Sequence, residues 1–365
     1  MMRAPSLIRA IAGVACALAP AVAPTRAQGT ESPSSARAGI LLTLPTSARA
    51  LGLAEAAGSI EASEWALFAA PAQLARTRGF AAGLASEAYL ASTHLSAVAV
   101  ALPLWRGALG VGATLLDFGS VSEIASSTPG FDGVETGRTV SAQDDAIVIG
   151  YGLVVPWTPW LSGVRAGAAV EFVRTRVADL SASGAAASAG LAWTSRGGWD
   201  VTAGVQHVGG DISIGATRGA LPRTWRAGVA APAMQMGRAH LRPMAELRDT
   251  HLGGKAVAVA GEVSWPGTRG AEFSVRGGYT VRGGGPDDHW PVSLGAGLGL
   301  GHFAIDYAMQ RFSRIDQVTH RIGIRFARAV PGPSTHGAAQ EAAHEAAHEA
   351  ARTTRGSTVS PATTR

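Results

Sequence analysis

The sequence predicts an all-β protein: an antiparallel transmembrane β-barrel of about 14 strands with an N-terminal helical plug and a low-complexity C-terminal tail. Composition is the first of three observations behind this prediction. Glycine accounts for 47 of the 365 residues, whereas only 16% of the residues are charged. The chain is therefore too apolar for a disordered protein and too glycine-rich for a helical bundle.

The second observation is a period-two alternation of apolar with small or polar residues, repeated through residues 79–328. This pattern is typical of strands that have one apolar face. Runs of ~10 residues, tilted near 45°, cover ~23 Å, which is close to the apolar band of an outer-membrane barrel. In one run Leu298 falls on the lipid side and Gly297 on the lumen side. The alternation therefore predicts that Leu298→Arg is costly and that Gly297→Ser is nearly neutral.

The third observation is the sorting of connections and tryptophans. The longest predicted connections, 119–141, 209–221 and 283–289, all follow odd-numbered strands, which puts them on one side of a barrel. Tryptophan prefers the membrane–water interface, and six tryptophans flank the short turns of the other side. These residues form a predicted interface girdle: Trp105, Trp157, Trp160, Trp193, Trp199 and Trp265. A soluble exported β-protein, the alternative fold, would have no reason to sort them so.

Residues 1–27 read as a secretory signal, with Arg3 and Arg9 before a short apolar stretch and a small-x-small cleavage site at 25–27. Its removal would take away Cys16, the single cysteine. The mature chain could then have no disulfide scaffold, no zinc–cysteine site and no thiol nucleophile. The formal charge of +5 would fall to +2 with the loss of Arg3, Arg9 and Arg26 (5 − 3). So small an excess gives no reason to expect a nucleic-acid partner.

The low-complexity tail, residues 329–365, contains His344-Glu345-Ala346-Ala347-His348, which matches the H-E-x-x-H pattern of zinc proteases. A catalytic zinc needs a third protein ligand and an ordered surrounding site. The match follows from a four-residue E-A-A-H repeat, so we predict neither a metal site nor any other cofactor. The tail is expected to be disordered or partly helical.

The segment 28–78 precedes the first strand and is predicted to be a periplasmic hatch. Residues 40–78 are apolar at helical spacing and are expected to fill or gate the lumen, with the helical run ending at Pro71. Charged residues on inward rows of the barrel are expected to form a solvated lumen wall with internal ion pairs. The lumen-facing or gating candidates are Arg165, Glu171, Arg276, Asp306, Arg321, Arg325 and Pro71.

Four motifs resemble the PorV/PorQ proteins, a family of FadL-like outer-membrane barrels. They are Ala48-Arg49-Ala50-Leu51-Gly52-Leu53-Ala54-Glu55-Ala56, Ala70-Pro71-Ala72-Gln73-Leu74-Ala75, residues 178–184 and residues 319–326. The chain departs from the family pattern at Ala70 and Gln73, where relatives carry asparagine and glycine. The resemblance implies a non-enzymatic barrel in the bacterial outer membrane, surrounded by lipid.

The same resemblance leaves two functions open. PorV-like members serve type IX secretion and hold secreted protein substrates, and we favour a function of this kind. FadL-like members are channels for uptake or export of hydrophobic small molecules. Catalysis is not expected, because the histidines (His94, His207, His251, His289, His302 and His320) are scattered and lie in no nucleophile motif.

Overall fold

The computed structural model describes residues 36–90, 93–125, 133–155, 163–215, 217–251, 253–268, 270–283, 292–312 and 317–329. The predicted signal segment 1–27, the H-E-x-x-H repeat and nearly all of the tail lie outside the described residues. Trp157 and Trp160 of the predicted girdle also lie outside them.

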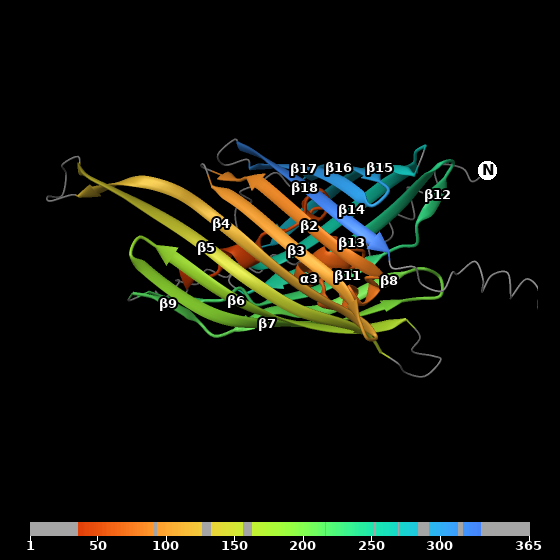
Figure 1. Ribbon diagram of the computed structural model, residues 1–365, viewed down its shortest axis with the longest axis horizontal. Coiled ribbons are helices and arrows are strands. Elements are labelled where there is room, and N and C mark those ends of the chain that lie inside the picture. The colour runs from red at the N-terminus through yellow and green to blue at the C-terminus, as the bar shows by residue number, and fades with distance from the viewer. Residues whose placement is uncertain are drawn as a thin grey trace, which may run out of the picture. The chain divides into compact units, whose positions relative to one another are not determined.

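Fourteen long strands of the described chain form one closed antiparallel barrel, which confirms the predicted fold class (Figure 1). Neighbours in the chain are neighbours in the sheet, β18 bonds to β2, and β11 bonds to both β8 and β13. A short strand, β12 (Met234–Met236), adds only to the edge of β13. The barrel strands are β2 (Gly79–Ala88), β3 (His94–Leu104), β4 (Gly107–Ala125), β5 (Val134–Val154), β6 (Val164–Val177), β7 (Leu180–Thr194), β8 (Asp200–Gly209), β11 (Thr224–Ala230), β13 (Ala239–Thr250), β14 (Gly254–Pro266), β15 (Ala271–Gly283), β16 (Val292–Leu300), β17 (Phe303–Phe312) and β18 (Gln317–Ala329).

The outer face of the barrel is apolar. Burial alternates along β2, where Phe80 and Leu84 point outward and Ala81, Gly83 and Ala85 point inward. The same alternation exposes large apolar side chains on the other strands, among them Ile147, Ile149, Val170, Phe172, Leu294, Ile305, Ile322 and Ile324. A closed sheet satisfies every backbone group within the wall and leaves no edge, which is the condition for crossing a bilayer with strands. These features exclude the soluble alternative.

The β4–β5 hairpin corrects one predicted loop. Residues 119–141 were expected to be a connection, but β4 and β5 remain paired through Ser120↔Ser141 and as far as Ala125↔Val134, with two register shifts. This β4–β5 arm reaches beyond its neighbours (Figure 1) and is exposed on both faces. Apolar and polar residues do not alternate where both faces of a two-stranded ribbon are exposed to solvent, so the sequence of this arm does not indicate strands.

A second, small sheet connects the start of the described chain to the β8–β11 connection. The strand β1 (Ala36–Arg37) pairs in parallel with β10 (Thr217–Ala220), and β10 pairs with β9 (Ile212–Ile214). We call this end of the barrel, which also carries the β4–β5 arm, the long-loop end. The other, with the β3–β4, β7–β8 and β16–β17 turns, is the short-turn end. The periplasmic position expected for residues 28–78 stays a prediction.

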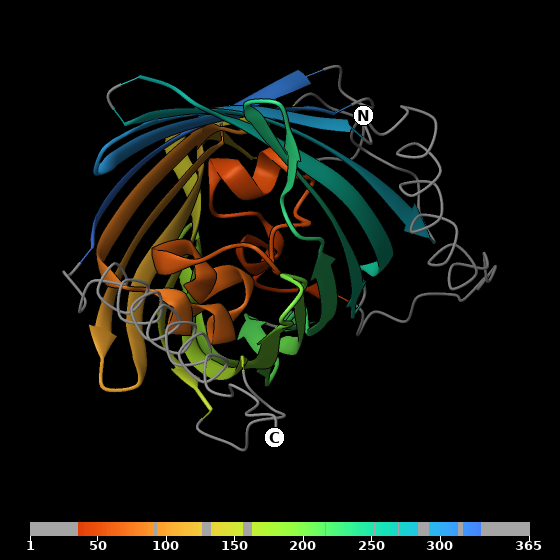
Figure 2. The ribbon, with the colours of Figure 1, turned by 90° about the vertical axis from the view of Figure 1, so that its right-hand side faces the viewer.

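Residues 36–78, which we call the hatch, run through the lumen from the long-loop end to the start of β2 at the short-turn end. Figure 2 shows the hatch inside the ring of strands. Its helices are short: η3 (Ile40–Thr43), α2 (Ala48–Gly52), η4 (Ser63–Trp65), α3 (Ala66–Ala69) and η5 (Pro71–Arg76). Within the described ranges, no helix is long and apolar enough to span a membrane.

Local chemistry explains how two of these helices begin. Ser47 caps α2 by accepting a hydrogen bond from the backbone N–H of Ala50 at 3.0 Å. The helical run was predicted to end at Pro71. Instead, Pro71 is the first residue of a further helix, η5. Proline is tolerated there because the missing N–H would have no intrahelical partner.

Small residues on the wall let the hatch pack closely. A Cβ at Gly167 would lie 2.3 Å from the backbone N of Ala72, and one at Gly52 of the hatch would lie 3.0 Å from the Cα of Gly295. The expected near-neutral effect of Gly297→Ser stays a prediction, although the space beside Gly297 is occupied by wall side chains. A Cβ there would lie 2.5 Å from Asp306 Oδ1 and 2.8 Å from Arg276 Nη2, so a serine would require these side chains to shift.

Candidate functional site

Two cavities lie between the hatch and one side of the wall. The larger one, which we call the upper cavity, has a volume of about 60 Å³ and room for several water molecules. It is bounded by Leu41, Leu42, Thr43, Leu44, Pro45, Thr46, Ala50, Glu55, Ala57, Gly58, Phe68, Ala69, Thr114, Val148, Glu171, His207 and Arg226. Most of these residues come from the hatch, so any movement of the hatch changes the shape of this cavity.

The lower cavity is smaller, about 20 Å³, and almost entirely apolar. Its lining shares Gly58, Ala69 and Arg226 with the upper cavity. On the hatch it faces Ala70, Pro71 and Ala72. On the wall it faces β7, β8, β11 and β13, at Ala189, Gly190, Leu191, Thr202, Ala203, Gly204, Gln206, Arg226 and Glu246. Because the two cavities share walls, they lie one after the other along the same seam, which we call the open seam.

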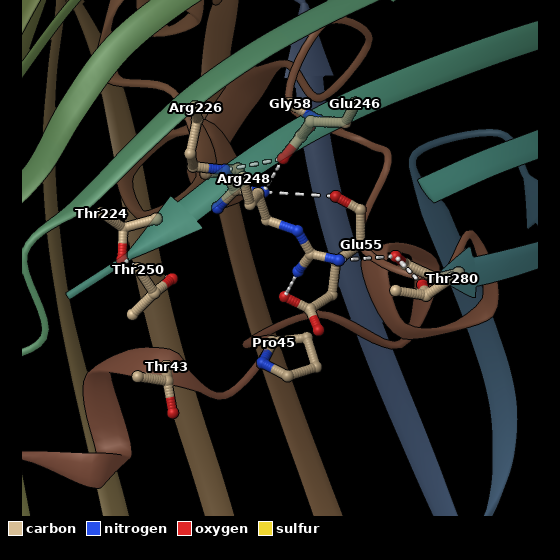
Figure 3. Close-up of polar contacts among 12 residues, drawn as sticks. Thr43, Pro45, Glu55, Gly58, Thr224, Arg226, Glu246, Arg248, Thr250 and Thr280 are labelled. Atoms are coloured by element: carbon tan, nitrogen blue, oxygen red, sulfur yellow. Dashed lines mark hydrogen bonds and ion pairs between the residues drawn. The ribbon is translucent and has the colours of Figure 1, made fainter. Parts of the chain in front are cut away.

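The charged groups at the junction of the two cavities are paired with each other (Figure 3). Arg226 bonds to Glu246, and its Nη2 donates to the carbonyl oxygen of Glu55 at 3.2 Å. Glu246 also accepts from the backbone N–H of Gly58 at 3.0 Å. Arg248 pairs with Glu55. The wall is thus joined to the hatch here by the Arg248–Glu55 pair and by two hydrogen bonds to hatch backbone atoms. Both ion pairs are neutral, so they leave no net charge facing the cavity.

A β-bulge shapes the wall of the upper cavity. The register of β7 and β8 shifts between Ala187 and Ala189, and His207 takes a left-handed φ of 57°. Both Gln206 and His207 therefore point inward and are buried. Gln206 Nε2 donates to the carbonyl oxygen of Phe68 at 2.7 Å, which fixes the hatch to the bulge. A non-glycine residue with such a φ is strained, as is common at functional positions.

Glu171, a predicted lumen residue, lies beside this bulge. Its carboxylate is 2.6 Å from His207 Nδ1 and accepts a hydrogen bond from the Ser188 hydroxyl at 2.5 Å. Serine, histidine and glutamate thus meet, but the hydroxyl donates to the carboxylate. A serine nucleophile needs its hydroxyl bonded to the base. The arrangement fits a buried polar network better than a hydrolase site.

The opposite side of the hatch meets β14–β17 through a chain of ion pairs, which we call the closed seam. Arg49 of the hatch holds Glu262 with two bonds, of 3.0 and 2.7 Å. Arg276, a predicted lumen residue, bonds to the same Glu262 and to Asp306, each at 2.5 Å. Bidentate arginine–carboxylate contacts are strong and geometrically specific, so this side of the hatch is held firmly.

Glu61 of the hatch lies next to this chain with only a weak partner. Arg49 Nη1 is 3.8 Å away, the side chain is fully buried, and neither carboxylate oxygen accepts a hydrogen bond within the described structure. Burial raises the pKa of the Glu61 carboxyl group above its ordinary value, because the charged form loses its hydration.

Arginines gather at the short-turn end of the lumen. Asp200, at the start of β8, bonds to Arg76 Nη1 at 3.1 Å and to Arg242 Nη2 at 2.5 Å. Arg165, a predicted lumen residue, lies 3.6 Å from the same carboxylate and donates to Thr194 Oγ1 at 2.8 Å. Among the described residues, Asp200 is therefore the shared counter-ion of three guanidinium groups.

The remaining predicted lumen residues also face inward. Arg321 is buried and bonds to Glu87 of β2 and to the carbonyl oxygen of Pro45, so it joins β18 to the hatch. Arg325 lies four residues further along β18 and is half-buried. Pro71 is buried, and its carbonyl oxygen packs against Gly152 and Gly167. The predicted internal ion pairs are present, but a hatch fills the space that was expected to be solvated.

The four described girdle tryptophans, Trp105, Trp193, Trp199 and Trp265, are exposed at the short-turn end. Trp105 sits in the β3–β4 turn, and the other three lie at or next to strand ends. This placement agrees with a membrane-interface role, which remains a proposal.

Sequence reasoning missed several residues that shape the site. Glu246, Arg248 and Glu262 lie on the inward rows of predicted strands and could have been found from alternation alone. Gln206 and His207 could not, because a bulge breaks the alternation on which the argument depends. Among the described residues, no group of three or more acidic, histidine or cysteine side chains is placed to hold a metal ion.

The fold is similar to solved outer-membrane transport proteins. A Pseudomonas aeruginosa FadL homologue matches with a TM-score of 0.53 and 12% identity, over 77% of this chain and 98% of that one. The Pseudomonas putida toluene transporter TodX matches with a TM-score of 0.52 and 12% identity, over 76% and 98%. The Ralstonia pickettii toluene transporter TbuX matches with a TM-score of 0.50 and 13% identity, over 76% and 97%.

No protein-family model and no curated protein matches the sequence. The shared fold is that of FadL-like barrels, so the FadL-like part of the expected resemblance is confirmed at the level of fold. A closed barrel of this kind is the architecture of a bacterial outer-membrane protein.

Proposed function

We propose that the chain is a channel for hydrophobic small molecules across the outer membrane, with the open seam as the route. The observation that carries this proposal is the pair of adjoining cavities between the hatch and the wall, the upper one facing β4, β5, β6, β8 and β11 and the lower one facing β7, β8, β11 and β13. Ligand sites are concave and mainly apolar, with a few placed polar groups. The toluene transporters TodX and TbuX share the fold, and a neutral hydrocarbon is the corresponding substrate class here.

The electrostatics of the seam support a neutral substrate. Arg226, Glu246, Arg248 and Glu55 neutralise each other at the junction of the cavities, so a charged group would meet no free partner there. The lower cavity is lined largely by alanine and glycine, which offer apolar contact without obstruction. In this structure the cavities are small, so passage requires a shift of the hatch segments that line them.

Ala69 offers the sharpest test because it lines both cavities and its side chain is only half-buried. Ala69→Phe should place a ring across the route and reduce uptake of radiolabelled toluene to the level of cells without the protein. Ala304→Phe is the matched control, since Ala304 is half-buried on the inward row of β17 outside both cavities. Unchanged uptake by Ala69→Phe, with normal amounts of folded protein, would refute the open-seam route.

Type IX-like secretion is the second candidate, and one observation favours it. The β4–β5 arm exposes Val121, Ile124 and Val134 beyond the barrel, a surface that a secreted protein could contact. Co-purification separates the two candidates. A bound hydrocarbon in the purified protein supports the channel, whereas a stably associated secreted protein that is lost on deletion of residues 120–140 supports secretion.

A further inference from the structure

The two ends of the outer surface differ in charge. At the short-turn end Arg78, Arg106, Arg196, Arg238 and Arg328 are exposed. The acidic residues described at this end, Asp200 and Glu272, lie on the inward rows of β8 and β15. At the long-loop end acidic and basic residues are mixed, and the pairs Arg138–Asp179, Arg176–Asp145 and Arg218–Asp211 neutralise each other.

Arg78 and Arg328 belong to neighbouring strand ends of this basic rim, the start of β2 and the end of β18. Arg78 lies two residues before Phe80 on β2, and Arg328 lies two residues after Phe326 on the neighbouring β18. The rings of Phe80 and Phe326 are 6.1 Å apart. Since β2 starts and β18 ends at this edge, both arginines extend past the phenylalanines on the outward face, and neither side chain forms an ion pair with a described residue.

An aromatic platform lies directly beside the two arginines. Phe303 of β17 packs 5.1 Å from Phe326, and the ring of His302 lies 6.1 Å from the same phenylalanine. Phe80 and Phe303 are exposed on the lipid-facing surface. The surface therefore changes, within two residues along each strand, from an apolar aromatic patch to paired cationic side chains.

We propose that Arg78 and Arg328, with the Phe80–Phe303–Phe326 platform, form a binding site for an anionic phospholipid. The lipid phosphate would accept hydrogen bonds from the two guanidinium groups, which are well suited to bind phosphate oxygens, and the acyl chains would cover the three rings. Two like charges held together without a protein counter-ion are stabilised by an anion between them. This site is independent of the open seam and of the transport proposal.

The test compares lipid preference in vesicles by tryptophan quenching, with dibrominated phosphatidylglycerol against dibrominated phosphatidylcholine. The wild-type protein should prefer phosphatidylglycerol. Each basic residue near a membrane surface contributes roughly fivefold to the affinity for anionic lipid. The double variant Arg78→Gln/Arg328→Gln should therefore lose on the order of twentyfold or more in local affinity, and the preference should fall towards unity.

Arg174→Gln/Arg223→Gln is the matched control. It removes the same charge from exposed arginines at the long-loop end and should leave the preference unchanged. If both double variants lost the preference for phosphatidylglycerol equally, the cause would be net charge and the proposed site would be wrong. It would also be wrong if the wild-type protein showed no preference for phosphatidylglycerol. Both doubles change exposed residues, and the far-ultraviolet circular dichroism of each variant establishes that the barrel is folded.

An added inorganic phosphate series, at constant ionic strength, separates a lipid headgroup from a free anion. Inorganic phosphate at millimolar concentration should not compete, because it lacks the acyl chains that the platform binds. Saturable competition would show that the arginines take free phosphate and would overturn the lipid assignment. Phe80→Ala/Phe303→Ala should weaken the preference while leaving both charges in place, and an unchanged preference would remove the platform from the site.

Discussion

The two sides of the hatch pack against the barrel in different ways. Along the closed seam, Arg49, Glu262, Arg276 and Asp306 form a continuous chain of ion pairs. Along the open seam, two cavities separate the hatch from the wall, and the lower one faces the small residues of β7 and β8. One side is anchored by strong directional contacts, and the other retains unfilled space.

The difference shows how a plugged barrel can combine stability with passage. Dense packing resists rearrangement, because filled cores have few alternative arrangements. A region with few buried contacts opens at lower free energy than its surroundings. We therefore expect hatch movements to begin at the open seam, with the closed seam as the fixed side.

Breaking the closed seam should have the largest effect. Arg276→Met leaves Glu262 and Asp306 without their shared cation, and loss of one partner of a buried pair costs about 3–5 kcal/mol. The free energy of unfolding, measured in urea with the protein in lipid vesicles, should fall by that amount. Arg138→Met, which removes the exposed pair with Asp179, should cause no measurable change. Equal effects would contradict the contrast between anchored and surface pairs.

The outer face of the same wall gives the next largest effect. Leu298→Arg puts a charge on the lipid side of β16, one outward position before the strand ends at Leu300. It should cost about 2 kcal/mol, the low end of the range for the bilayer centre because the penalty falls towards the interface, measured in the same unfolding assay. Gly299→Ser is the lumen-facing control, since the only atoms within 4 Å of a Cβ there belong to Glu272, at 3.7 Å. If both variants were equally tolerated, the assignment of lipid and lumen faces would be wrong.

Paired glycine substitutions compare the packing of the two seams directly. A Cβ at Gly278 would lie 2.7 Å from backbone and side-chain atoms of Leu53 and Ala54, whereas one at Gly190 would meet nothing closer than 3.0 Å. Gly278→Ala should destabilise the protein by about 1–3 kcal/mol through overpacking, and Gly190→Ala should cost less. The reverse order in urea unfolding would invalidate the division into a closed and an open seam.

The smallest effect concerns pH. Burial raises the pKa of Glu61 in the folded protein, so above the ordinary carboxyl pKa of about 4.3 the unfolded chain releases a proton that the folded chain retains. The folded state therefore loses stability as the pH rises from that value towards the folded pKa. Glu61→Gln should match the wild type at pH 4 and be more stable at pH 7, as measured by hydrogen exchange of the hatch amides. If the wild type and Glu61→Gln exchanged at equal rates at pH 4 and also at pH 7, ionisation of Glu61 would not destabilise the folded protein.

The sequence by itself determined the barrel. Alternation fixes which side chains face lipid in the regular parts of the membrane-spanning strands, because a strand has a period of two and the lipid-facing side chains are apolar. The same rule put Arg165, Glu171, Arg276, Asp306, Arg321 and Arg325 inside. Local patterning also indicated helices in the hatch, although Pro71 starts one of them where an end was expected.

Only the tertiary structure decided what those inward residues do. Arg49 and Glu262 are 213 positions apart, and no periodicity shows which arginine meets which carboxylate across a lumen. The bulge at His207 and the exposed β4–β5 arm were not predicted for a related reason. Alternation indicates a strand with one polar and one apolar face, so it fails where the register shifts or where both faces are exposed to solvent. The open seam is likewise a property of how the hatch lies against the wall, since a cavity exists only once distant segments have packed.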